Sequence, residues 1–128
     1  MKRNLLTFGI LAVAMLLPCV ASAKNLAGYT TVDGWNYEVY DDGTAKLTSA
    51  PGATGSVVVP DAVTHNGKSY TVTYLGGESF NGNKDITAIH LPAGLKTLGG
   101  RALYDCTNLE TVTGGPEALE NIYQYNLI

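Results

Sequence analysis

Two histidines, one cysteine and an aspartate pair are the chemically most capable side chains after residue 23. A nucleophile needs a base and an orienting third group beside it. His65 borders an Asn-Gly turn, where solvation alone explains a polar side chain, and His90 lies far along the chain in an apolar segment. Asp41 and Asp42 precede a glycine, which is common turn chemistry, whereas calcium loops need several oxygens at fixed spacing. These residues predict no enzyme, no metal site and no cofactor.

Aromatic residues gather between positions 35 and 74. Such rings usually fill a core or form cross-strand pairs, but exposed rings at strand spacing can stack on sugars. A carbohydrate-binding module is therefore the alternative function. The aromatic set is Trp35, Tyr37, Tyr40, Tyr70 and Tyr74.

The elements that must position these side chains are strands. β-branched and aromatic runs over 28–48 are separated by turn signals and predict a three-stranded meander. Asp33-Gly34 and Asn66-Gly67 are type I′ hairpin signals. Apolar residues nowhere keep helical spacing for three turns after residue 23. The expected fold is mainly β.

The last third of the chain repeats itself. Leu-Gly-Gly-Glu-Ser-Phe at 75–80 returns as Leu-Gly-Gly-Arg-Ala-Leu at 98–103, 23 residues later. A fixed period of 20 to 29 residues predicts a leucine-rich repeat solenoid, in which neighbouring turns stack to bury one internal column. The predicted structural column is Leu75, Phe80, Asn83, Ile86, Ile89, Leu91, Leu98, Leu103, Cys106, Leu109 and Val112.

In this frame the strand over 86–92 points Ile89 and Leu91 inward and leaves its alternate residues on an open face. The segment 57–60 fits the same pattern and is expected to be an earlier strand of the stack. We expect the open face to bind a partner through Val58, Ala88, His90, Thr111 and Thr113. Asn83 and Cys106 should satisfy backbone groups of the repeat turns, and Cys106 should be a buried free thiol.

The repeat resembles the BspA-like (Treponema-type) leucine-rich repeat family over roughly 57–122, and the segment 66–72 resembles the hairpin that often leads into such repeats. The resemblance implies a secreted or surface protein of host-associated bacteria. It implies adhesion to protein or extracellular-matrix partners on a host surface, and no enzymatic activity. The sequence departs from the pattern at 112–116, where a Leu-Pro pair would sit.

Residues 1–23 have the basic start, apolar run and Ala-Ser-Ala site of a signal peptide. We expect export to the periplasm, the cell surface or the medium; a lipid anchor at Cys19 is disfavoured by Pro18. Removing this segment leaves 6 basic and 11 acidic side chains, a balance that argues against nucleic acid.

The remainder, 24–128, is expected to be one compact unit. It divides into a meander cap at 24–56 and a repeat segment with its leading hairpin at 57–128, which holds about two repeats. Solenoids generally need three or more repeats to be stable. The apolar residues within 122–128 therefore predict either self-association through that end or a chain that is a truncated form of a longer repeat array.

Overall fold

The fold is taken from a computed structural model, which describes residues 24–116. The predicted signal peptide and the predicted self-association segment 122–128 lie outside the described residues. All regular elements in the described range are strands, which confirms the mainly β prediction. The described part of the chain contains no helix suited to crossing a membrane.

The first three strands form the predicted meander. They are β1 (Leu26–Val32), β2 (Trp35–Tyr40) and β3 (Thr44–Ser49), and both pairs are antiparallel. At the first hairpin Asp33 and Gly34 have φ values of 52° and 84°, as a type I′ turn requires. The prediction for this part of the chain is confirmed.

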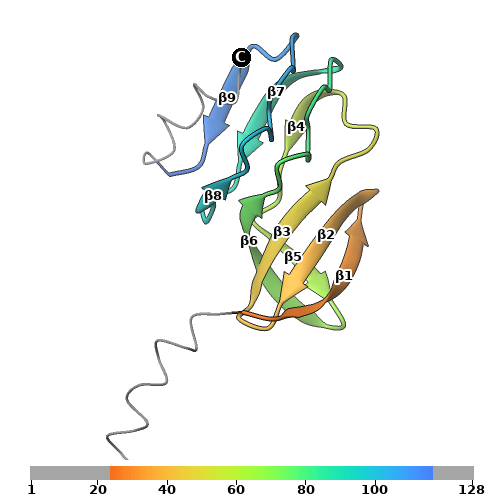
Figure 1. Cartoon of the computed structure of the whole chain (residues 1–128), viewed down its shortest axis with the longest axis vertical. Coiled ribbons are helices and arrows are strands. Elements are labelled where there is room, and N and C mark those ends of the chain that lie inside the picture. Colours follow the sequence, from red (N-terminus) through yellow and green to blue (C-terminus); the bar gives the residue numbers. More distant parts are fainter. Residues whose placement is uncertain (1–23, 117–128) are drawn as a thin grey trace, which may run out of the picture.

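The second hairpin extends the same sheet. It consists of β5 (Ala62–His65) and β6 (Lys68–Leu75), and β6 pairs with β3 in parallel. The strand order is β1-β2-β3-β6-β5, and the short β8 (Thr97–Leu98) pairs with the end of β6. The leading hairpin therefore shares a sheet with the meander, and β6 continues from that sheet into the repeat (Figure 1).

The two edges of this sheet approach each other through His65. A Cβ added to Gly28 of β1 would lie 2.8 Å from His65 Nε2, so the imidazole rests directly on that strand. The same ring lies 6.3 Å from the ring of Tyr70, centroid to centroid. His65 is half-buried. Solvation alone was the wrong expectation, because the curl of the sheet brings β1 against β5.

The second sheet is parallel and carries the repeat. It consists of β4 (Gly55–Val58), β7 (Ile86–Leu91) and β9 (Thr111–Gly114), in that order. Val57 aligns with Ile89 and Ile89 with Val112, so the segment at 57–60 is a rung, as expected. Away from the strands, successive coils remain tied: the Phe80 N–H donates to the Ala102 carbonyl at 3.0 Å.

The repeated Leu-Gly-Gly motif contains a glycine that the packing of the coils requires. The Gly99 N–H donates to the Leu75 carbonyl at 2.8 Å, which holds one coil against the next. A Cβ on Gly99 would lie 2.4 Å from the backbone nitrogen of Gly77 and 2.6 Å from its Cα. Backbone packs on backbone here, so a side chain at Gly99 has no room. Gly100 is different, because a Cβ there would meet no atom within 4 Å.

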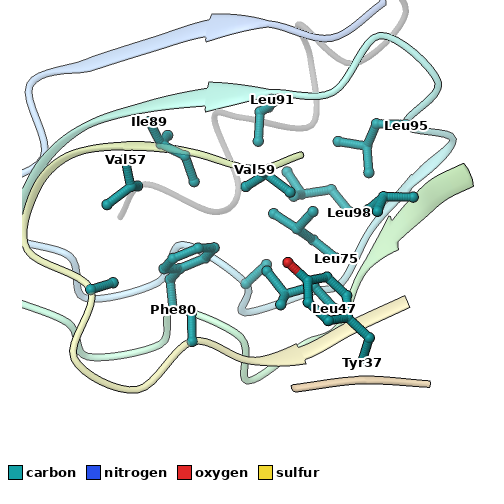
Figure 2. Close-up of a cluster of buried hydrophobic side chains, with 14 of the residues drawn as sticks. Tyr37, Leu47, Val57, Val59, Leu75, Phe80, Ile89, Leu91, Leu95 and Leu98 are labelled. Atoms are coloured by element: carbon teal, nitrogen blue, oxygen red, sulfur yellow. The ribbon is translucent and has the colours of Figure 1, made fainter. Parts of the chain in front are cut away.

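One core joins the two sheets. Figure 2 shows Tyr37 and Leu47 of the meander in the same cluster as Leu75 and Leu91 of the repeat. Each of these four side chains is at most 2% exposed. Since apolar burial is the main favourable term in folding, this shared core holds the meander and the repeat together.

The residues of the predicted structural column lie inward to different degrees. Eight are buried: Leu75, Phe80, Ile86, Ile89, Leu91, Leu98, Leu103 and Cys106. Three are half-buried: Asn83, Leu109 and Val112. Leu109 and Val112 belong to the last described coil, where the described residues supply no further coil to cover them.

Candidate functional site

The candidate site is the open face of the sheet β4-β7-β9. Parallel register places Val58 beside His90 and His90 beside Thr113, in a row that crosses all three strands. Ala88 lies beside Thr111 on one side and beside Ser56 on the other, in a second row across the three strands. The structure thus brings together all five residues selected from the sequence.

These five side chains face solvent. Val58 is 63% exposed, which is unusual for an apolar strand residue, and only Ala88 is half-buried. The alternating strand geometry causes this, because Val57, Ile89 and Leu91 take the inward positions. The open face is of mixed polarity and has no Asp, Glu, Lys or Arg among its five residues.

His90 has one defined partner on this face. Its Nδ1 lies 3.0 Å from Thr113 Oγ1, and which atom donates depends on the tautomer. This bond links β7 to β9 and orients the imidazole. Within residues 24–116, no three His, Cys, Asp or Glu side chains gather as a metal site would require. The open face can therefore offer a partner van der Waals contacts and hydrogen bonds.

An apolar pocket lies at the β4 end of the open face. We call it the junction pocket; its volume is about 250 Å³. Its lining residues are Val32, Asp33, Trp35, Tyr37, Val58 and Pro60. The first four come from the hairpin β1-β2, and the last two from β4 and the residues just after it. Val58 therefore belongs to both the open face and the junction pocket.

Two walls of the junction pocket, Trp35 and Tyr37, pack against or within the hydrophobic core. The Trp35 ring stands edge-on to Phe80, with centroids 5.6 Å apart and planes at 83°. Tyr37 is 2% exposed. Burial, and secondarily the charge of Asp33, raise the pKa of Tyr37 to about 12, so the phenol is neutral at physiological pH.

A wider hollow of about 500 Å³ separates the loop at 49–52 from the turn at 79–85. Asn83 lines it, but the amide is already engaged: Nδ2 donates to the Ala53 carbonyl at 3.0 Å, and Oδ1 accepts from the N–H groups of Asp85 and Ile86. Asn83 thus has the backbone-satisfying role expected from the sequence.

Cys106 occupies the matching position one coil later. Its Sγ lies 3.0 Å from the Phe80 carbonyl, to which the thiol donates, and the side chain is 5% exposed. Burial raises the pKa of the thiol, which disfavours the reactive thiolate. The residue ties two coils together.

The aromatic set divides between two environments. Tyr37 and Tyr70 are buried, so neither ring can stack on a sugar. Tyr40 and Tyr74 are half-buried, and Tyr29, which the sequence did not single out, is 69% exposed. Cross-strand register places Tyr29 beside Glu38, Glu38 beside Lys46, and Lys46 beside Tyr74.

Charged groups surround these three tyrosines. The Tyr40 hydroxyl donates to Glu38 Oε1 at 2.6 Å, and the Lys46 ammonium lies 4.8 Å from the centre of the Tyr74 ring. Lys46 Nζ is also 3.9 Å from Glu38 Oε1. We call this surface the tyrosine face; it consists of Tyr29, Glu38, Tyr40, Lys46 and Tyr74.

The aspartate pair is engaged in local turn structure. Asp41 accepts from the backbone and side-chain nitrogens of Asn25, both at 3.0 Å. Asp42 accepts from the Thr44 hydroxyl at 2.6 Å and from the Thr44 N–H at 3.1 Å. These hydrogen bonds lower the pKa of each carboxyl.

Sequence reasoning missed the junction pocket. Asp33 was interpreted only as a turn residue, and no sequence period relates the hairpin tip to the strand at 55–58. The available signal was the valine at position 58, since an apolar residue predicted to face outward suggests a contact surface.

The fold and the face can now be compared with known proteins. No model of a protein family matches the sequence, and no curated protein matches it. A solved leucine-rich repeat protein from Bacteroides capillosus is 29% identical and covers 68% of this chain, with a TM-score of 0.62. A leucine-rich cell surface protein from Faecalibacterium prausnitzii is 25% identical and covers 74%, with a TM-score of 0.63.

These likenesses define the class: the chain has the fold of bacterial leucine-rich repeat proteins, as the BspA-like resemblance implied. The chain spans 65% of the length of the Bacteroides protein and 28% of the Faecalibacterium protein. Proteins of this fold are generally non-catalytic binding modules, because stacked strands present an extended surface.

Proposed function

We propose that this protein is a secreted or cell-surface adhesion module that binds a protein or matrix partner through the open face. The observation that carries the proposal is the row of Val58, His90 and Thr113 on aligned strands, with the apolar Val58 63% exposed. An apolar group beside polar hydrogen-bonding groups is the usual composition of a protein contact surface. The surface location of the Faecalibacterium protein is consistent with this proposal.

The test is partner capture with a face variant. The protein, purified after export, is immobilised and exposed to host and bacterial surface extracts; the captured partner is identified and its Kd is measured. His90→Ala with Thr113→Glu should weaken binding more than about fivefold, the effect of losing a central contact worth over about 1 kcal/mol. The matched control is Thr64→Glu, since Thr64 is exposed on β5 in the other sheet. Unchanged binding by the face variant would refute this site.

A glycan-binding function is the second candidate, and the tyrosine face favours it. Tyr29 offers an exposed ring, while Glu38 and Lys46 supply an acceptor and a donor for sugar hydroxyls. Glycan-array binding that is lost in Tyr40→Ala and kept in Tyr104→Ala would support it. Tyr104 is a suitable control because it is 40% exposed and lies in the repeat.

A further inference from the structure

The junction pocket continues the open face toward the meander. The exposed row crosses the sheet from Thr113 through His90 to Val58, and Val58 is also a wall of the pocket. A partner that covers this row therefore reaches the pocket at its β4 end. This inference rests on the proposed function and adds which side chains the partner must present.

The size and walls of the pocket match a single side chain. Its volume of about 250 Å³ is below the roughly 300–1,000 Å³ of sites for drug-sized molecules. Five of its six lining residues are apolar or aromatic, and the contact of Trp35 with Phe80 fixes one wall. Pre-formed apolar pockets next to a flatter face are where interface anchor residues insert.

The pocket also has a charge preference. Asp33 is the one acidic residue among those that line the pocket. It is exposed, and it forms no ion pair with any group in residues 24–116. A partner with a positive charge next to its anchor would satisfy this carboxylate, whereas an acidic neighbour would be repelled.

We propose that the junction pocket receives one large apolar side chain of a protein partner lying on the open face, and that a lysine or arginine adjacent to that side chain pairs with Asp33. The partner is thus a polypeptide segment with an aromatic or branched aliphatic residue beside a basic one.

The probe is a random library of 12-residue peptides displayed on phage and selected on the full protein. We expect the enriched peptides to share Phe, Trp or Leu next to Arg or Lys. Synthetic copies then give Kd values with two pocket variants. Val58→Glu should weaken binding more than about fivefold by placing a charge at the apolar wall. Asp33→Asn should weaken it about 2- to 5-fold, the effect of one exposed ion pair, and abolish the preference for a basic residue.

Both variants preserve the fold for simple reasons. Asparagine tolerates the positive φ of 52° at position 33, and Val58 is largely exposed. Thr64→Glu is the matched charge control, and unfolding midpoints verify that all variants are folded. Thr64→Glu should bind the peptides like the unsubstituted protein.

The outcomes separate the two proposals. Enriched peptides without an apolar-basic pair, or affinities that neither pocket variant changes, would overturn the pocket inference. If His90→Ala with Thr113→Glu still weakens those peptides, the open face stands and the pocket falls. If no peptide is enriched, the pocket inference falls, whereas the open face is still decided by partner capture with His90→Ala and Thr113→Glu; if glycans alone bind, both proposals fall.

Discussion

Substituting Gly99 tests the stacking of the repeat most severely. Gly99→Ala adds a Cβ that would lie 2.4, 2.6 and 2.8 Å from three backbone atoms of Gly76 and Gly77. Backbone atoms cannot rotate away as a flexible side chain can. Ordinary contact begins near 3.4 Å, so the two coils must separate by about 1 Å at this point.

The expected cost follows from that separation. Overpacking of this kind costs about 1–3 kcal/mol. The Gly99 N–H to Leu75 carbonyl bond, now 2.8 Å long, would also be lost, at about 1 kcal/mol. Replacing glycine returns about 0.4–1 kcal/mol of unfolded-state entropy. The net loss is about 1–4 kcal/mol, which lowers the Tm of a domain of about 100 residues by roughly 5–30 °C.

Gly100→Ala is the matched control, because its Cβ meets no atom within 4 Å. Its stability should change by less than about 0.5 kcal/mol, or rise slightly. The assay is urea unfolding followed by circular dichroism, with Tm measured in parallel. Equal stability of the two variants would refute the close backbone stacking of successive coils.

Three further predictions concern the core, a turn and the alkaline range. Leu91→Ala should cost about 2–5 kcal/mol in urea unfolding, because Leu91 is 0% exposed, whereas Val58→Ala, at a 63% exposed position, should stay within about 0.5 kcal/mol; similar losses would contradict the assigned faces. Asn83→Ala should cost about 2 kcal/mol by freeing the turn N–H groups it satisfies, and Asn81→Ala, which loses one exposed hydrogen bond to a carboxylate, should cost far less. Burial raises the pKa of Tyr37 from 10.0 to about 12, so this shift contributes fully to the free energy of unfolding below pH 10. The contribution is lost as the pH rises toward 12, by about 1 kcal/mol per pH unit. Tyr37→Phe should lack this loss of stability between pH 10 and 12, and an unchanged loss would contradict burial of Tyr37 as its cause.

Much of the fold could be predicted because local signals and the repeat agree. Asp33-Gly34 and Asn66-Gly67 fix two hairpins through backbone conformations that few other residues adopt. The 23-residue period relates Ile89 to Val112, and the match of Val59-Pro60 with Leu91-Pro92 relates Val57 to Ile89, so all three align across strands that are distant in sequence. Stacking is periodic, and a period is visible in one sequence.

The contacts between the meander and the repeat could not be predicted in this way. The parallel pairing of β3 with β6 joins residues near 45 and 72 with no shared period. The junction pocket and the contact of His65 with Gly28 both depend on how that sheet curls. Nonlocal packing of this kind is decided by side-chain fit, which the pattern of polar and apolar residues does not specify.

The candidate site could likewise be predicted only in part. The open face followed from strand alternation, which places His90 outward once Ile89 and Leu91 are inward. The tyrosine face did not, because Tyr29, Tyr40 and Tyr74 come from three separate strands, β1, β2 and β6. Which ring is exposed depends on the strand that lies beside it.

Site-directed photo-cross-linking tests the central claim, that a partner docks on the open face, most directly. A benzophenone amino acid is placed at His90 in one version of the protein and at Lys68 in another; both positions are exposed, but Lys68 lies on β6 in the other sheet. After exposure to surface extracts, position 90 should yield one discrete cross-linked protein that position 68 does not yield. Cross-linking of that protein from position 68 alone, or no discrete product from position 90, would contradict the proposed binding face.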